Sequence, residues 1–120
     1  MATFTKSTLS GSTDGRPIKV VATATAGTVI HTGSTTATTI DEVWLYATNT
    51  SAADVKLTLE WGGVSSPDDL IEQTITAEAG LVLIAPGLLV KGNSTALIVR
   101  AFAATANVIT ISGYINQITA

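Results

Sequence analysis

The chain has 120 residues, of which 46% are hydrophobic and only 12% charged, with a net charge of −3 and no cysteine. This length suits one domain with a core of its own and is short for two. The acidic balance and the scattered Lys and Arg residues argue against nucleic-acid binding, which needs a basic patch, and the lack of cysteine excludes disulfides and thiolate metal sites.

The surface must be covered by residues other than charged ones, because the charged share is about half of the roughly 25% that is usual. Thr, Ser, Ala and Gly supply that cover. The β-branched residues Val, Ile and Thr are abundant, and they fit a pleated strand better than a helix. Residues 1–30 lack the apolar stretch of a signal peptide, and no run approaches the ~18 apolar residues that span a bilayer. We therefore expect a β protein without a signal peptide and without a membrane partner.

The first third of the chain predicts an arm followed by short strands. Residues 1–16 are polar and end in the turn sequence GSTDG, which predicts an extended N-terminal arm. Residues 18–24 and 27–33 predict two strands, while the Thr-rich segment 33–39 suits either a flexible link or a weak strand.

The middle of the chain contains the two clearest strands. In IDEVWLYATNT, residues 40–50, Trp44 and Tyr46 lie on one face and aliphatic residues on the other. In DVKLTLEWGG, residues 54–63, apolar and polar residues alternate. A short turn separates the two segments, so we expect them to pair as an antiparallel hairpin with one face in the core and one in water.

The last third predicts further short strands. LIEQTITAE (70–78) alternates as a strand, although residues 69–78 also suit one or two helical turns because DDLIEQ has an acidic start. The apolar runs LVLIA (81–85) and ALIVRAF, within the predicted strand 95–103, are bounded by turn residues and predict strands that are buried on both faces. GLLVKG (87–92) predicts a further strand. NVITISGYINQI (107–118) closes the chain with a row of Ile on one face.

Together these segments predict an all-β fold. About eight short strands, with turn signals every 8 to 12 residues, are typical of an antiparallel β-sandwich that resembles a jelly roll. We expect two parts: the arm at residues 1–16, and a single sandwich domain at residues 17–120.

The residues of a catalytic or metal site are missing from the pattern. His31 is the single histidine, no nucleophile motif accompanies it, and we expect it in a strand or turn, facing solvent or a neighbour. The pairs Asp41-Glu42 and Asp68-Asp69 are sequence neighbours, and neighbours in a strand point to opposite faces. We therefore predict no catalytic residue, no metal ligand, no cofactor and no enzyme activity.

Apolar side chains occur on strand faces that should be wet. A small two-layer sandwich has one interior and cannot bury both faces of many strands. Some of these residues could be isolated exposed side chains, which are normal on any surface. We favour a protein–protein contact surface, which the low charge also suits. The predicted interface residues are Trp44, Tyr46, Ile98, Phe102, Val108 and Tyr114.

Residues 40–118 carry a resemblance to a known group. The segments VWLYATNTSAADVKLTLEW and LVLIAPGLLVKGNSTALIVRAFAATANVITISGYINQI resemble small all-β structural proteins of tailed bacteriophage virions. The similarity lies in the spacing of strands and turns: a strand, an Asn-Thr turn and a strand, then a Gly-containing bend, and a closing V-x-I-x-G-Y-I-N-x-I.

The resemblance implies a virion component made in the host cytoplasm. Its first implication is a capsid decoration (cement) protein that sits on the capsid surface and clamps the major capsid protein. This protein is expected to be a homo-oligomer, a trimer. A tail, neck or fibre-base accessory protein is the alternative within the same class. A carbohydrate- or host-surface-binding module is an alternative from another class, with Trp44, Tyr46 and Trp61 as the aromatic residues that would stack on sugars.

Overall fold

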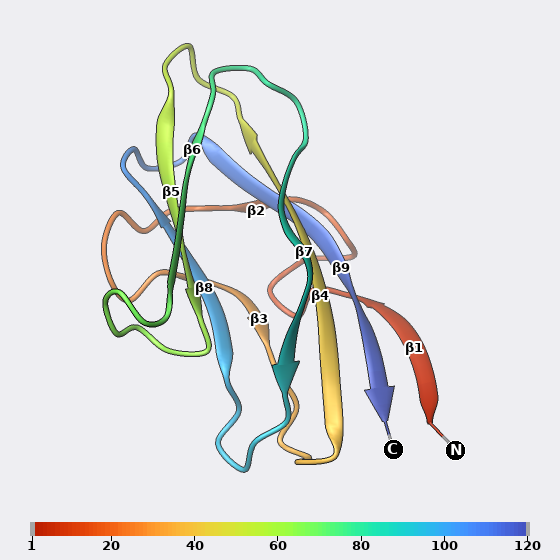
Figure 1. Cartoon of the computed structure of the whole chain (residues 1–120). Coiled ribbons are helices and arrows are strands. Elements are labelled where there is room, and N and C mark those ends of the chain that lie inside the picture. Colours follow the sequence, from red (N-terminus) through yellow and green to blue (C-terminus); the bar gives the residue numbers. More distant parts are fainter. Residues whose placement is uncertain (1, 120) are drawn as a thin grey trace.

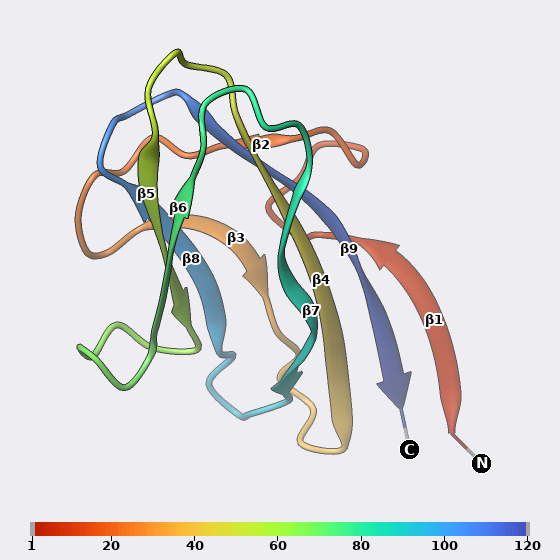
Figure 2. The same ribbon diagram turned by 45° about the horizontal axis from the view of Figure 1, so that its top comes forward.

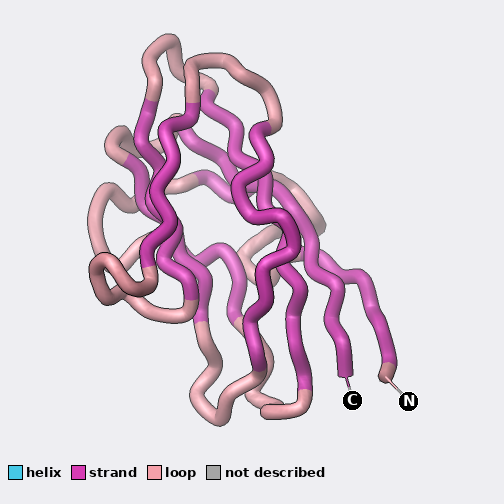
Figure 3. Tube along the Cα trace, in the orientation of Figure 1, coloured by secondary structure: helices cyan, strands magenta, loops and turns pink. Residues whose placement is uncertain are grey.

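A computed structural model describes residues 2–119, and this part of the chain consists of strands and loops without a helix (Figure 3). The nine strands are β1 (Thr3–Thr8), β2 (Ile18–Lys19), β3 (Thr28–Thr32), β4 (Thr39–Asn49), β5 (Val55–Trp61), β6 (Leu70–Ile75), β7 (Val82–Lys91), β8 (Ile98–Ala103) and β9 (Ile109–Thr119). The predicted all-β class is confirmed.

The strands form two antiparallel sheets that lie face to face as two layers (Figure 1). Sheet A has the order β1-β9-β4-β7, and β2 also pairs with β9. Sheet B has the order β3-β8-β5-β6. The predicted antiparallel sandwich is therefore present.

The strand pairs are nested, as in a long hairpin that has been rolled up. β5 pairs with β6 at the centre of the chain, then β4 with β7, β3 with β8, and β2 with β9. Rolling this hairpin adds the pairs β4–β9 and β5–β8, which complete the two sheets. This nesting defines a jelly roll, and it places strands from both ends of the chain side by side (Figure 2).

Alternation along the strands builds one core between the sheets. β4 buries every second residue, including Val43 and Leu45, and presents the others on the outside of sheet A. Sheet B contributes Leu57 and Leu59 from β5 and Val99 from β8 to the same core.

The predicted hairpin of residues 40–50 with 54–63 is wrong. β4 lies in sheet A and β5 in sheet B, so the turn between them carries the chain from one layer to the other. Both strands alternate as expected, but alternation sets which side chains face the core and leaves the pairing partner open. Nesting pairs β4 with β7 instead, and rolling adds β9 as its second neighbour.

The predicted strands 81–85 and 87–92 are a single strand, β7. Pro86 lacks an N–H group, and it is tolerated because β7 is an edge strand of sheet A. Of the two register shifts against β4, one falls at Gly87 and accommodates the Pro86-Gly87 bend, and the other falls at Ile84. The expectation that LVLIA is buried on both faces is also wrong, since Leu81 and Leu83 are exposed.

The expected arm contains a strand of the sandwich. β1 pairs in continuous register with β9, from Thr3 opposite Thr119 to Thr8 opposite Tyr114. Leu9 then turns into the core. Within residues 70–78, Leu70–Ile75 form the strand β6 and the rest is a turn, without the helical turns that we also considered. Residues 1 and 120, the outer ends of the expected arm and domain, lie outside the described residues.

Candidate protein interface

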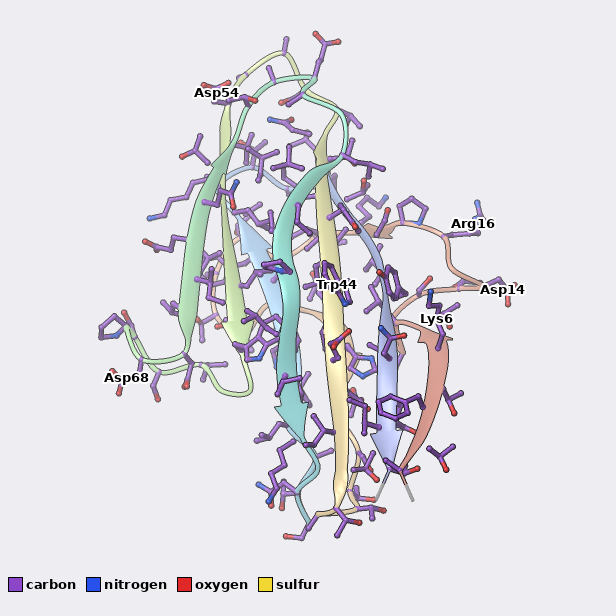
Figure 4. All side chains as sticks on the ribbon, turned by 45° about the vertical axis from the view of Figure 1, so that its right-hand side comes forward. Lys6, Asp14, Arg16, Trp44, Asp54 and Asp68 are labelled. Carbon is purple, nitrogen blue, oxygen red and sulfur yellow. The ribbon has the colours of Figure 1, made fainter. Side chains whose placement is uncertain are left out.

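The outside of sheet A carries the largest concentration of the predicted interface residues. We call this surface the outer face of sheet A, and it consists of the even-numbered residues of β1, β9 and β4 together with Leu83, Pro86 and Leu89 of β7. In-register neighbours on adjacent strands share a face, so the register arranges these side chains in rows across the sheet. Figure 4 looks onto this surface, with Trp44 near the middle of β4 and Lys6 beside β9.

An aromatic pair occupies the centre of the outer face. Trp44 of β4 and Tyr114 of β9 are register partners, and their rings are stacked with centroids 6.2 Å apart and planes 11° apart. The indole also lies over β7, since a Cβ added to Gly87 would come within 3.1 Å of a Trp44 ring carbon. Gly87 adopts a φ of 78° that favours glycine, so both its conformation and its missing side chain make room for the ring.

A carboxylate next to the aromatic pair is held by two donors. Trp44 Nε1 donates to Glu42 Oε1 at 2.8 Å, and Asn116 Nδ2 donates to the same oxygen at 2.9 Å. These hydrogen bonds, the one from Trp44 first, lower the pKa of Glu42 because they stabilise its charged form, while partial burial acts in the opposite direction. Glu42 therefore fixes the indole of Trp44 against the sheet.

A cation covers the other side of the aromatic pair. The Nζ atom of Lys6 lies 5.0 Å from the centroid of the Tyr114 ring, within the range of a cation–π contact. Both charges in this region are thus engaged within the chain, one by hydrogen bonds and one by an aromatic ring. A partner that covered the outer face would not leave either of them unpaired.

Exposed apolar side chains lie on both edge strands of the outer face. Phe4 of β1 is 70% exposed, Leu89 of β7 is 55% exposed and Leu83 is 44% exposed. Leu83 is the register neighbour of Tyr46, and Phe4 is that of Ile118. Apolar groups therefore extend from one edge strand of sheet A to the other, which is the composition expected at the centre of a protein contact.

The structure brings together only some of the predicted interface residues. Trp44, Tyr46 and Tyr114 share the outer face of sheet A, whereas Ile98 and Phe102 lie on β8, on the outside of sheet B. Val108, which we expected beside Tyr114, packs against the core just before β9 begins. All six side chains are half-buried.

Sequence reasoning missed the most exposed apolar residues of this surface. Alternation in TFTKST already places Phe4 and Lys6 on one face, but the segment was assigned to an arm. Leu89 lies in the predicted strand GLLVKG, and its place on the outer face depends on the β4–β7 register, which a single strand does not show.

A second group of polar residues lies buried between the sheets. His31 of β3 is 3% exposed, and its Nε2 atom lies 2.7 Å from Asp41 Oδ2 of β4. The backbone N–H of Ser10 donates to His31 Nδ1 at 3.1 Å, and Gln117 Nε2 donates to Asp41 Oδ1 at 3.0 Å. Because a backbone N–H can only donate, Nδ1 accepts, and the proton sits on Nε2 and points to Asp41.

His31 and Asp41 are residue types found in catalytic pairs, but here no ring nitrogen of His31 is left to accept a proton. A general base needs a ring nitrogen that can take a proton, and both nitrogens of His31 already have partners. The hydroxyl of Ser10 accepts a hydrogen bond from the backbone of Thr32 at 2.6 Å. The His31–Asp41 contact is thus a structural link between the sheets.

Glu60 is a buried carboxylate on the outside of sheet B. The segment before β3 covers it: Thr25 Oγ1 donates to Oε2 and the Gly27 N–H donates to Oε1, both at 2.7 Å. Across residues 2–119 there is no group of three or more His, Cys, Asp or Glu that could hold a metal ion, and no helix long and apolar enough to cross a membrane.

Comparison with known protein families, with curated proteins and with solved structures found no match for this chain.

Proposed function

We propose that the chain is a structural protein of a virion, a decoration protein that binds the capsid surface of a tailed bacteriophage and stabilises the head lattice. The observation that carries the proposal is the outer face of sheet A, where Trp44 and Tyr114 stack on the central strands and exposed apolar side chains lie on both edge strands. The resemblance of residues 40–118 to phage virion proteins supplies the kind of partner, and it is independent of the side-chain geometry.

The chemistry of the outer face supports a protein partner. Interfaces are rich in Trp, Tyr and Phe, and this surface carries Trp44, Tyr114 and Phe4, with two charged residues beside the aromatic pair. Its two central charges, Glu42 and Lys6, already have partners within the chain. Covering them therefore adds little desolvation cost, while the exposed side chains of Phe4 and Leu89 add apolar area.

The proposed mechanism is stabilisation by mass action. A protein that binds the assembled lattice and not its free subunits raises the free energy of disassembly by RT ln(1 + [L]/Kd) at each site. Here [L] is the concentration of the free decoration protein and Kd is its dissociation constant from the lattice. At a concentration 100 times Kd this amounts to about 2.7 kcal/mol for each site, and a lattice contains many sites. No chemistry is required of the protein beyond binding.

The experiment is sedimentation of purified protein with purified mature, empty heads of the phage whose genome encodes the chain. We expect the wild-type protein to sediment with heads up to a fixed stoichiometry and to raise their disruption temperature. Leu89→Ser removes exposed apolar area without touching the core, and we expect it to weaken binding at least tenfold. Val64→Ala, at an exposed apolar residue in the β5–β6 loop, is the matched control and should bind as the wild type does.

Binding to purified tails but not to heads would move the assignment to a tail, neck or fibre-base accessory protein. Binding to neither particle would reject the virion proposal. Equal binding by wild type and Leu89→Ser would reject the outer face of sheet A as the contact surface.

One observation favours a carbohydrate-binding module as a second candidate. Asn116 and Glu42 lie next to the stacked rings of Trp44 and Tyr114, so acceptors and aromatic faces meet at one place. Trp61, which we also considered, is on the other sheet, where it packs against the core and donates to the Leu89 backbone. A glycan array with hits that disappear in Trp44→Ala would support this candidate, and an array without hits would remove it.

A further inference from the structure

We propose that β1 is a site of strand addition, and that its occupant is β1 of a second copy of this chain. The two strands would pair antiparallel about a twofold axis and join two copies of sheet A into one continuous sheet. This inference concerns the edge of sheet A and does not depend on the proposed virion function.

β1 is an unusually open edge. All six of its residues are exposed, including Thr5 and Ser7, which alternate with Phe4 and Lys6 and therefore face the sheet-B side. They are exposed because β1 and the end of β9 extend beyond the strands of sheet B (Figures 1 and 2). Both faces and one edge of this strand thus lie open.

The other edge strands are blunted in ways that proteins use against strand addition. β7 contains Pro86 and two register shifts, and β3 has a register shift between Val29 and His31. β6 carries Glu72 at its middle, and its Leu70 N–H is already bonded to Pro67. β1 has a continuous register, with neither proline nor bulge.

The backbone groups that point to the open edge can be assigned from the ladder. The Val20 N–H donates to the Ile109 carbonyl, so the odd-numbered residues of β9 direct their backbone groups to the β1 side. Their partners Thr3, Thr5 and Ser7 bond to β9. Alternation then directs the N–H and C=O groups of Phe4 and Lys6 to the open edge, where no hydrogen bond to them occurs among the described residues.

These positions restrict how two copies can pair. The residues whose backbone groups point to the open edge, Phe4 and Lys6, must lie opposite the same residues of the second copy to form hydrogen bonds. This pairing also places the outer faces of the two copies of sheet A on the same side of the joined sheet. Two symmetric registers then pair five residues of each strand. One is centred on Lys6 and sets Lys6 opposite Lys6 of the second copy, which is unfavourable.

The other register is centred on Thr5. It sets Phe4 of each copy opposite Lys6 of the other, so that a cation meets an aromatic ring twice. A contact of this size buries little area, so we expect a weak dimer that forms with increasing concentration. It would also put the Trp44–Tyr114 pairs of two copies on one shared surface. This contact makes two copies; the trimer expected from the resemblance would need a different one.

The chain has no cysteine, so single cysteines report on this register directly. Across the axis, the Cα atoms of the two Thr5 residues would lie about 4.5 Å apart, within the range of a disulfide. We expect Thr5→Cys to give a disulfide-linked dimer under mild oxidation. The matched control Ser7→Cys would place its Cα atoms roughly 14 Å apart and should stay monomeric.

A second variant separates pairing from folding. Lys6→Pro removes an edge-directed N–H and leaves the bonds from β1 to β9 in place, so the fold should persist. We expect it to abolish the cross-link in the Thr5→Cys background and to abolish the concentration-dependent rise of the wild-type mass above 12.3 kDa in sedimentation. A mass of 12.3 kDa at every concentration up to millimolar, equal cross-linking of Thr5→Cys and Ser7→Cys, or a cross-link that survives Lys6→Pro would each overturn the proposal.

Discussion

The Nε2 atom of His31 lies 2.7 Å from Oδ2 of Asp41, and this buried contact joins β3 of sheet B to β4 of sheet A. Ser10 and Gln117 complete it, so the loop after β1 and the strand β9 are tied to the same point. Elsewhere the two layers meet mainly through apolar packing, which is tolerant of small shifts. The polar link therefore fixes how the layers are placed relative to one another.

Replacing Asp41 tests this link. Asp41→Ala leaves the N–H of His31 and the amide of Gln117 without an acceptor, and we expect it to lower the free energy of unfolding by about 3 kcal/mol. Asp41→Asn keeps one acceptor and should cost about half as much. Urea unfolding measures both. Asp68→Ala, in the exposed loop before β6, is the control, and a loss for Asp41→Ala as small as for this variant would contradict a structural role of the link.

Glu42 predicts a dependence of stability on pH. Its folded-state pKa is lowered by the hydrogen bonds from Trp44 and Asn116, so its contribution to stability is present above the model-compound pKa of 4.5. The contribution is lost as the pH falls through the lowered folded-state pKa. We expect the difference in unfolding free energy between wild type and Glu42→Gln to shrink over this acid range.

The Trp44 indole N–H gives a local reading of the same titration by NMR. Its signal should shift with pH in the wild type and not in Glu42→Gln. Glu72→Gln, on sheet B and paired with Lys56, should leave the Trp44 signal as in the wild type. A Trp44 signal that does not move between neutral and acid pH in the wild type would show that the hydrogen bond does not control this carboxylate.

Gly113 marks a close approach between β9 and β4. A Cβ at this position would lie 1.9 Å from the carbonyl oxygen of Trp44, which is backbone and cannot rotate away. We expect Gly113→Ala to separate the two strands and to lower the free energy of unfolding by about 3 kcal/mol. Thermal unfolding is the measurement. Gly80→Asn is the control, since no atom lies within 4 Å there and asparagine tolerates its φ of 78°.

The segment that covers Glu60 contains Thr25 and Gly27, and we expect the loss of the Thr25 hydroxyl to destabilise it. Thr25→Ala removes one of the two hydrogen bonds to this buried carboxylate, and we expect a loss of about 2 kcal/mol together with local opening. The amide of Gly27, which donates to the other oxygen, should exchange with solvent faster by at least tenfold. Unchanged exchange at Gly27 would mean that the cover is held by other contacts.

Local patterns predicted the class of the fold and left its pairing open. Alternation in residues 40–50 identified which side chains of β4 face the core, because that depends on the strand alone. The partner of β4 depends on the rolling of the whole chain, and β7 and β9 lie far away in sequence. For the same reason a short turn after residue 50 suggested a hairpin, where the chain in fact changes layer.

The candidate surface was predictable in part. Trp44 and Tyr46 were placed on an outer face by alternation, whereas the contact of Trp44 with Tyr114 required the β4–β9 register. The pairing of His31 with Asp41 had no signal in the sequence, since the two residues lie in different sheets. Sequence also gave no sign that Glu60 is buried, because its cover comes from a loop far away along the chain.

Because Thr3 and Thr119 are register neighbours on β1 and β9, both ends of the chain leave the molecule at one corner. A few flexible residues could therefore close the backbone into a ring, and new termini could be opened at the exposed loop between β5 and β6 without cutting a strand. In such a permutant β1 would lie in the middle of the sequence, and every strand pair of the two sheets would be kept. The corner where β1 and β9 end would then carry no chain terminus.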